Sequence, residues 1–118
     1  MYHTLSKREK KIARECIDKG LNSAFTRALD EAGSALQEWH EKNIPVADAY
    51  HKLYGIIDKH NKAIARRYDN ITGSKYLHVV AELFAEKMIT EEDIKDFSEP
   101  AKQYIHKSGS FLPDYPNP

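Results

Sequence analysis

The sequence of 118 residues has little of the residue types that mark several large classes of protein. It contains a single cysteine, Cys16, so no disulfide can form within one chain and nothing points to an oxidising compartment. Its apolar runs are a few residues long, far short of the roughly 20 residues that span a bilayer. No apolar run near the N-terminus resembles a signal peptide. We therefore expect a cytoplasmic protein without a membrane segment.

An excess of charge of one sign is also lacking. Lys and Arg number 18, Asp and Glu number 18, and the net charge is zero. A neutral chain is not attracted as a whole to nucleic acid or to an anionic membrane. Two local basic clusters leave a nucleic-acid-associated helical protein as the alternative function. They are Lys7, Arg8, Lys10, Lys11 and Arg14, and Lys59, Lys62, Arg66 and Arg67.

What is present is helical periodicity, and it begins with a long first segment. Ser6 and Glu9 have the spacing of a capping box, which starts a helix over 6–43. Gly20 is unfavourable in a helix interior and leaves open a division of this segment into two helices. Apolar residues recur every three or four positions, and we assign the dimer interface to Leu21, Ala24, Ala28, Ala32, Ala35 and Trp39.

The remaining pattern predicts shorter helices. A heptad seam predicts a helix over 45–68, and Ser74 is the expected cap of a third helix over 74–88. Short helices follow over 90–106, the first of them opened by Thr90 with Asp93. We predict an all-α fold with one domain over 1–107 and a Pro-rich extended or disordered tail over 108–118. The seam on the second helix consists of Val46, Tyr50, Leu53, Ile57, His60 and Ile64.

The length of the first helix predicts a dimer. A helix from Ser6 to Asn43 would be about 55 Å long, at 1.5 Å per residue. A compact chain of this size has a radius of gyration of roughly 13–14 Å. Part of the apolar stripe would therefore face water unless a second copy covers it through a two-fold interface. The alternative is a helix broken at Gly20 that folds into a compact monomeric bundle.

The second half of the chain resembles the fluorescence recovery protein family. The resemblance covers roughly Pro45 to Ile105 and lies in Arg67-Tyr68-Asp69-Asn70, in the register of Lys52-Leu53, and in the run Ala81-Glu82-Leu83-Phe84-Ala85-Glu86-Lys87-Met88-Ile89-Thr90-Glu91-Glu92. It implies an elongated homodimer without a cofactor, built by the long N-terminal helices, with the short C-terminal helices forming head regions. Members of the family bind the photoactivated orange carotenoid protein and speed its return to the resting state, acting through a conformational equilibrium.

The residues at the family's partner-binding surface differ here. That surface carries a Trp, a His three residues on, an Asp next and an Arg six residues beyond. The corresponding positions, and our predicted partner-binding residues, are His51, Tyr54, Gly55 and Asn61. The substitution of Arg by Asn removes a planar cationic group. We therefore expect a non-catalytic homodimer whose protein partner has changed, with a regulatory or chaperone-like role.

Motifs for catalysis or metal binding are weak. The six histidines include no pair four residues apart on one helix, so we predict no metal site. Cys16 has no surrounding nucleophile signature and is predicted to be structural. The acidic run Glu91-Glu92-Asp93 is explained by the first turn of a helix. We therefore predict no enzymatic activity and no cofactor.

Overall fold

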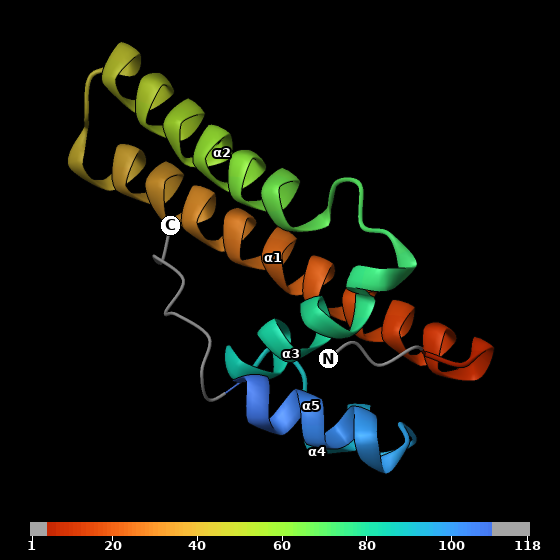
Figure 1. The fold of residues 1–118 in the computed structure, drawn as a ribbon. Helices are drawn as coiled ribbons and strands as arrows, with labels where there is room; N and C mark the ends of the chain where they lie inside the picture. The colour runs from red at the N-terminus through yellow and green to blue at the C-terminus, as the bar shows by residue number, and fades with distance from the viewer. Residues whose placement is uncertain (1–4, 110–118) are drawn as a thin grey trace. The chain divides into compact units, whose positions relative to one another are not determined.

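The structure, a computed structural model, describes residues 5–109, and in this range it is entirely helical apart from turns and connections (Figure 1). The long N-terminal helix predicted from the periodicity is confirmed. The helices are α1 (Lys7–Lys42), α2 (Val46–Tyr68), the 3₁₀ helix η1 (Gly73–Lys75), α3 (Tyr76–Ala85), α4 (Glu91–Ile94) and α5 (Glu99–Gly109). The described residues divide into two compact units, one formed by residues 5–21 and 70–109 and the other by residues 22–69.

The helix ends follow local chemistry in most places. Ser6 and Glu9 form the predicted capping box, with each backbone amide 3.1 Å from the other residue's side-chain oxygen. α1 continues through Gly20 without a break, so the division considered there does not occur. α1 is followed directly by Asn43 in the left-handed region at φ 50°, a conformation that Asn tolerates better than most residues. α2 ends where the backbone of Asp69 becomes extended, and Asn70 follows in the left-handed region at φ 61°.

Three boundaries differ from those expected. α3 ends at Ala85, three residues before the predicted end at 88, and Lys87 then takes a left-handed conformation at φ 62°. Ser74 does not cap α3, because the helix begins after Lys75 without a side-chain cap, and the Ser74 hydroxyl lies 2.9 Å from that of Thr72. α5 extends to Gly109, so the first two residues of the predicted tail over 108–118 are helical. The rest of that tail lies outside the described residues.

The first unit has a closed apolar core. About the first four turns of α1 belong to this unit together with α3, α4 and α5, and α3 and α5 lie against each other. Burying these side chains removes apolar surface from water, which is the main source of stability for such a unit. The largest of the fully buried side chains are Leu83, Ile94, Ile105 and Val80.

The second unit is a helical hairpin made of the later turns of α1 and the whole of α2 (Figure 1). Asn43-Ile44-Pro45 connects the helices, and Pro45 precedes the first turn of α2, where its missing N–H costs nothing. The buried residues of this hairpin are only Ala28, Ala32, Ile56 and His60.

Candidate protein-binding surface

Ion pairs fix the register of the hairpin along one edge. Lys59 Nζ lies 3.0 Å from Oε2 of Glu31, and Lys52 Nζ lies 3.4 Å from Oε1 of Glu38. The two carboxylates are seven residues apart on α1 and the two amines are seven apart on α2, in opposite order. The pairs therefore sit two turns apart along an antiparallel helix pair.

Glu31 also binds the one buried polar residue of the hairpin. His60 is 4% exposed, and its Nε2 lies 3.0 Å from Oε1 of Glu31. The hydrogen bonds from His60 and then from Lys59 lower the pKa of the Glu31 carboxyl below its ordinary value. This carboxylate therefore stays ionised and connects α1 to two neighbouring residues of α2.

The opposite side of the hairpin is apolar and exposed. At about 100° per residue, the exposed apolar residues of α1 point about 120–160° away from Glu31, and those of α2 point about 140–180° away from Lys59. Because the helices are antiparallel, these directions meet on one face, which we call the apolar face. It consists of Phe25 (46% exposed), Leu29 (68%), Leu36 (43%), Val46 (71%), Tyr50 (67%) and Tyr54 (65%).

The size of the apolar face distinguishes it from scattered surface residues. With about 200 Å² for a complete aromatic side chain and somewhat less for an aliphatic one, the six residues expose on the order of 600–700 Å². The largest apolar patch on an ordinary monomer is about 300–600 Å² and is often functional. The apolar face is therefore the strongest candidate for a binding surface in the hairpin.

The predicted dimer residues on α1 are largely covered within the single chain. Ala28 and Ala32 are each 7% exposed, and Ala35 is half-buried. Ala28 and Ala35 lie three residues before and four after Glu31, so they share its side of α1, toward α2. The other three predicted residues, Leu21, Ala24 and Trp39, are also half-buried. The side chains of α1 with surface to offer a second chain are instead those of the apolar face.

The predicted partner-binding residues are all exposed on α2. His51, Tyr54, Gly55 and Asn61 lie within about a third of the helix circumference. Tyr54 belongs both to this set and to the apolar face, and the ring of His51 meets that of Tyr50 edge-on, with centroids 5.7 Å apart. The four residues therefore form one continuous strip of surface that borders the apolar face.

Two helical glycines present gaps that the chain itself does not require. A Cβ added at Gly33 in α1 or at Gly55 in α2 would meet nothing within 4 Å, and no described glycine has a positive φ. Glycine inside a helix costs about 1 kcal/mol relative to alanine. At neither position does a turn or close packing within the chain require glycine. Gly33 was not singled out from the sequence, although a glycine among apolar residues in a long helix is a visible signal.

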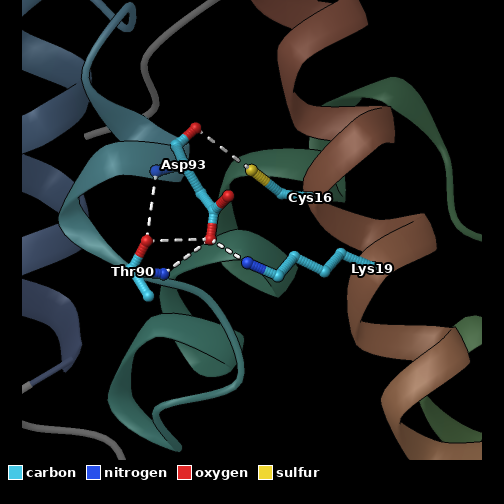
Figure 2. A network of polar contacts seen from close by, with 4 residues as sticks. All are labelled: Cys16, Lys19, Thr90 and Asp93. Carbon is cyan, nitrogen blue, oxygen red and sulfur yellow. Dashed lines mark hydrogen bonds and ion pairs between the residues drawn. The ribbon is translucent and has the colours of Figure 1, made fainter.

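In the first unit, Asp93 organises a polar network (Figure 2). Its carboxylate accepts a hydrogen bond from the backbone N–H of Thr90 at 2.8 Å and pairs with Lys19 Nζ at 2.7 Å. The hydrogen bond from Lys19 is the main reason that the pKa of Asp93 is lowered. The Thr90 hydroxyl accepts from the Asp93 backbone, which completes a capping box at the start predicted for this helix at Thr90 with Asp93.

Cys16 lies beside this network and is chemically quiet. Its thiol is 3% exposed and lies 3.7 Å from the backbone oxygen of Asp93. Burial, followed by the negative charge of Asp93, raises the pKa of the thiol to about 11. A nucleophilic cysteine needs a lowered pKa, so this environment favours a structural thiol.

Glu9 is a second buried carboxylate, and the sequence predicted only half of its bonding. Besides its capping bond to Ser6, it accepts a hydrogen bond from the backbone N–H of Ser98 at 3.0 Å, at the start of α5. Burial alone would raise the pKa of Glu9, but the hydrogen bonds from Ser98 and Ser6 outweigh it and lower the pKa to about 2. The carboxylate thus joins the starts of α1 and α5.

A small acidic hollow of about 180 Å³ lies next to Cys16. Its lining residues are Ile12, Glu15, Cys16, Asp93 and Asp96. Within residues 5–109, no group of three or more His, Cys, Asp or Glu side chains is placed to hold a metal ion. The Asp93 carboxylate is already engaged by Lys19 and Thr90. The hollow therefore offers little to a cation.

Two further observations bear on the alternatives raised by the sequence. In the second basic cluster, Lys59 pairs with Glu31 and Lys62 pairs with Asp58 at 2.9 Å, which reduces the positive field available to a phosphate. In the part of the chain that the structure describes, no helix combines the length and apolar character needed to cross a membrane.

Comparisons with family models, with curated proteins and with solved structures find no match to this chain. The resemblance to the fluorescence recovery protein family therefore stays a prediction from the sequence.

Proposed function

We propose that this chain is a non-catalytic, homodimeric protein-binding module with a regulatory or chaperone-like role. The observation that carries the proposal is the apolar face, where six large side chains from α1 and α2 are 43–71% exposed. An apolar surface of this extent costs free energy in water, and covering it with protein recovers that free energy.

The two groups whose pKa values are shifted most strongly, Glu9 and Cys16, support a role without catalysis. The low pKa of Glu9 follows from its position between the starts of two helices, and the high pKa of Cys16 follows from burial. A catalytic acid or base works best with a pKa near the operating pH, and a thiol nucleophile needs a depressed pKa. Both groups have moved away from those values.

The proposed dimer is tested by sedimentation velocity over a range of about 1–100 µM. We expect a species of twice the chain mass at the upper end of the range. The double variant Leu36→Glu/Tyr54→Glu, which places two charges on the apolar face, is expected to sediment as a single chain with unchanged helical circular dichroism. A wild-type chain that stays monomeric at 100 µM would contradict the proposal.

The proposed partner site is the strip formed by His51, Tyr54, Gly55 and Asn61. The family it resembles acts on the orange carotenoid protein, and the residue types at this strip differ from those of the family. We therefore propose that the partner has changed. Purified photoactivated orange carotenoid protein, tested against immobilised chain, should not be retained. If the wild-type chain retained the orange carotenoid protein and the His51→Ala and Tyr54→Ala variants did not, this chain would bind the family's partner through the proposed site. That result would contradict the proposed change of partner.

A further inference from the structure

Gly33 lies in the middle of an exposed ridge on α1. Phe25, Leu29, Gly33 and Leu36 are four, four and three residues apart, so all four point to one side within about 80° of arc. Glycine is unfavourable inside a helix, and no neighbouring atom within the chain occupies the space in front of Gly33. The ridge therefore has a gap at its centre that is flanked by projecting apolar side chains.

We propose that two chains pair through an antiparallel contact between their α1 helices, with Leu29 of each chain seated on Gly33 of the other. The proposal rests on the homodimer of the proposed function and names the contact at its centre. The two-fold axis passes between Leu29 and Gly33, at the level of residue 31. In a two-fold interface each contact between two different residues occurs twice. Leu29 of the first chain therefore meets Gly33 of the second, and Leu29 of the second meets Gly33 of the first.

The spacing of the ridge fits this axis. Leu29 and Gly33 lie two residues on either side of the midpoint, so the two-fold rotation brings each opposite the other. Phe25 lies about 9 Å before the midpoint and Leu36 about 7.5 Å after it, so these two face each other within about 1.5 Å along the axis. A parallel pair would instead place Leu29 on Leu29 and leave both gaps at Gly33 open. The ridge therefore selects the antiparallel arrangement.

The surface around the ridge favours a second copy over a charged partner. Residues 22–69 contain seven Lys or Arg and seven Asp or Glu, so two hairpins do not repel each other through net charge. On this side of α1 the residues are Asn22, Phe25, Leu29, Gly33, Leu36 and His40, without Asp, Glu, Lys or Arg. An acidic or basic protein would find no complementary charge there. An identical, uncharged ridge needs no charged partner groups and can pack against it.

The area available also fits a second copy. The apolar face exposes on the order of 600–700 Å² per chain, by the aromatic side-chain area used above. A stable protein–protein interface of standard size buries about 800 Å² per partner. The apolar face thus supplies most of the area that such an interface needs from each partner, and Gly33 allows the two backbones to approach closely at the centre.

The test compares the same substitution at the two glycines that face open space. Gly33→Leu and Gly55→Leu both replace an unfavourable helical residue without a clash inside the chain. We expect Gly33→Leu to raise the dimer dissociation constant at least tenfold, measured by sedimentation equilibrium. Gly55→Leu should leave it within twofold, and circular dichroism should show both variants at least as helical as the wild type.

A compensating variant makes the test specific for the contact. Adding Leu29→Ala to Gly33→Leu exchanges the projecting residue and the gap, and the two-fold symmetry repeats the exchange on the second copy. We expect this double variant to recover most of the affinity lost in Gly33→Leu. A dimer unaffected by Gly33→Leu, or equally weakened by Gly55→Leu, would overturn the contact and leave the dimer standing. A wild-type chain without any dimer would overturn the proposed function as well.

Discussion

The two units of this chain differ in how far their apolar side chains are buried. Of the 17 buried hydrophobic residues within residues 5–109, 14 lie in the unit formed by residues 5–21 and 70–109, and three lie in the hairpin. All six of the exposed large hydrophobic residues of the described chain belong to the hairpin. A unit of four packed helices can enclose a core, whereas two helices can cover only one stripe of each other. The hairpin is thus the unit with apolar surface left for a partner.

The largest expected effect contrasts one leucine from each unit. Leu83→Ala removes a fully buried side chain and is expected to lower the free energy of unfolding by about 3–4 kcal/mol, through lost transfer energy and the cavity left behind. Leu29→Ala, at 68% exposure, is expected to change the stability of the dissociated chain by less than about 0.5 kcal/mol. Urea denaturation at concentrations below dimer formation measures both. Equal losses would remove the distinction between the units.

The next effect is the pH dependence contributed by Glu9. Its folded pKa of about 2 lies below its ordinary value of 4.5, so its contribution is fully present above pH 4.5 and is lost as the pH falls toward 2. At about 1.36 kcal/mol per pKa unit, the loss is about 3 kcal/mol. Protection of amides in the first unit from hydrogen exchange should fall across this window. Glu31 and Asp93, whose pKa values are also lowered, act in the same direction.

The matched control for this pH effect is Glu9→Gln, which keeps the shape but does not titrate. The variant should be less stable near neutral pH and show a smaller decrease between pH 4.5 and 2. Fluorescence of Trp39, the only tryptophan, reports on the hairpin, so it should follow this titration less closely than exchange in the first unit. An unchanged acid profile in Glu9→Gln would show that other carboxyl groups determine it.

A smaller loss is expected from removing the cap of α4. Thr90→Ala deletes the hydroxyl that accepts from the Asp93 backbone and is expected to cost about 1 kcal/mol, seen as a lower midpoint of thermal unfolding. Thr90→Ser retains the hydroxyl and should behave like the wild type. A Thr90→Ala chain with the wild-type midpoint would mean that the α4 turn is held by its packing alone.

The smallest effect is a gain. Lys87 follows α3 with φ 62°, a left-handed conformation that costs a non-glycine residue energy, and the Met88 N–H closes the turn on the Leu83 carbonyl at 2.9 Å. Lys87→Gly is expected to raise the free energy of unfolding by about 0.5–1 kcal/mol. Lys87→Ala removes the same side chain but keeps the cost, so it should give no gain. A gain in both variants would assign the effect to the lysine side chain.

Local chemistry made part of this structure predictable. The capping box at Ser6 and the helix start at Thr90 with Asp93 were predicted because they involve residues three positions apart, and both are present. The long first helix followed from apolar spacing and is also present. Ser74 also belongs to the residue types that cap helices, but its hydroxyl lies beside that of Thr72 instead. The preference for Ser at helix starts does not take such a competing local partner into account.

Long-range pairing was not predictable from such patterns. Glu9 accepts from Ser98, 89 residues away, and Glu31 meets His60, 29 residues away. The heptad seam on the second helix placed Val46 and Tyr50 with His60, yet Ile56 and His60 are buried while Val46 and Tyr50 are exposed. The contact with α1 lies about 60° around the helix from that seam, because the direction toward a partner helix depends on register across the hairpin.

The single buried thiol can be used to measure how often the first unit opens. With a pKa of about 11, Cys16 carries almost no thiolate near neutral pH, whereas an unfolded cysteine, with a pKa near 8.5, carries a few per cent. Alkylation by a thiolate-selective reagent will therefore proceed through opened molecules, one modification per chain and with no internal disulfide exchange to confuse it. The rate of Cys16 alkylation, measured by mass spectrometry, therefore reports the frequency with which the core of the first unit opens to solvent.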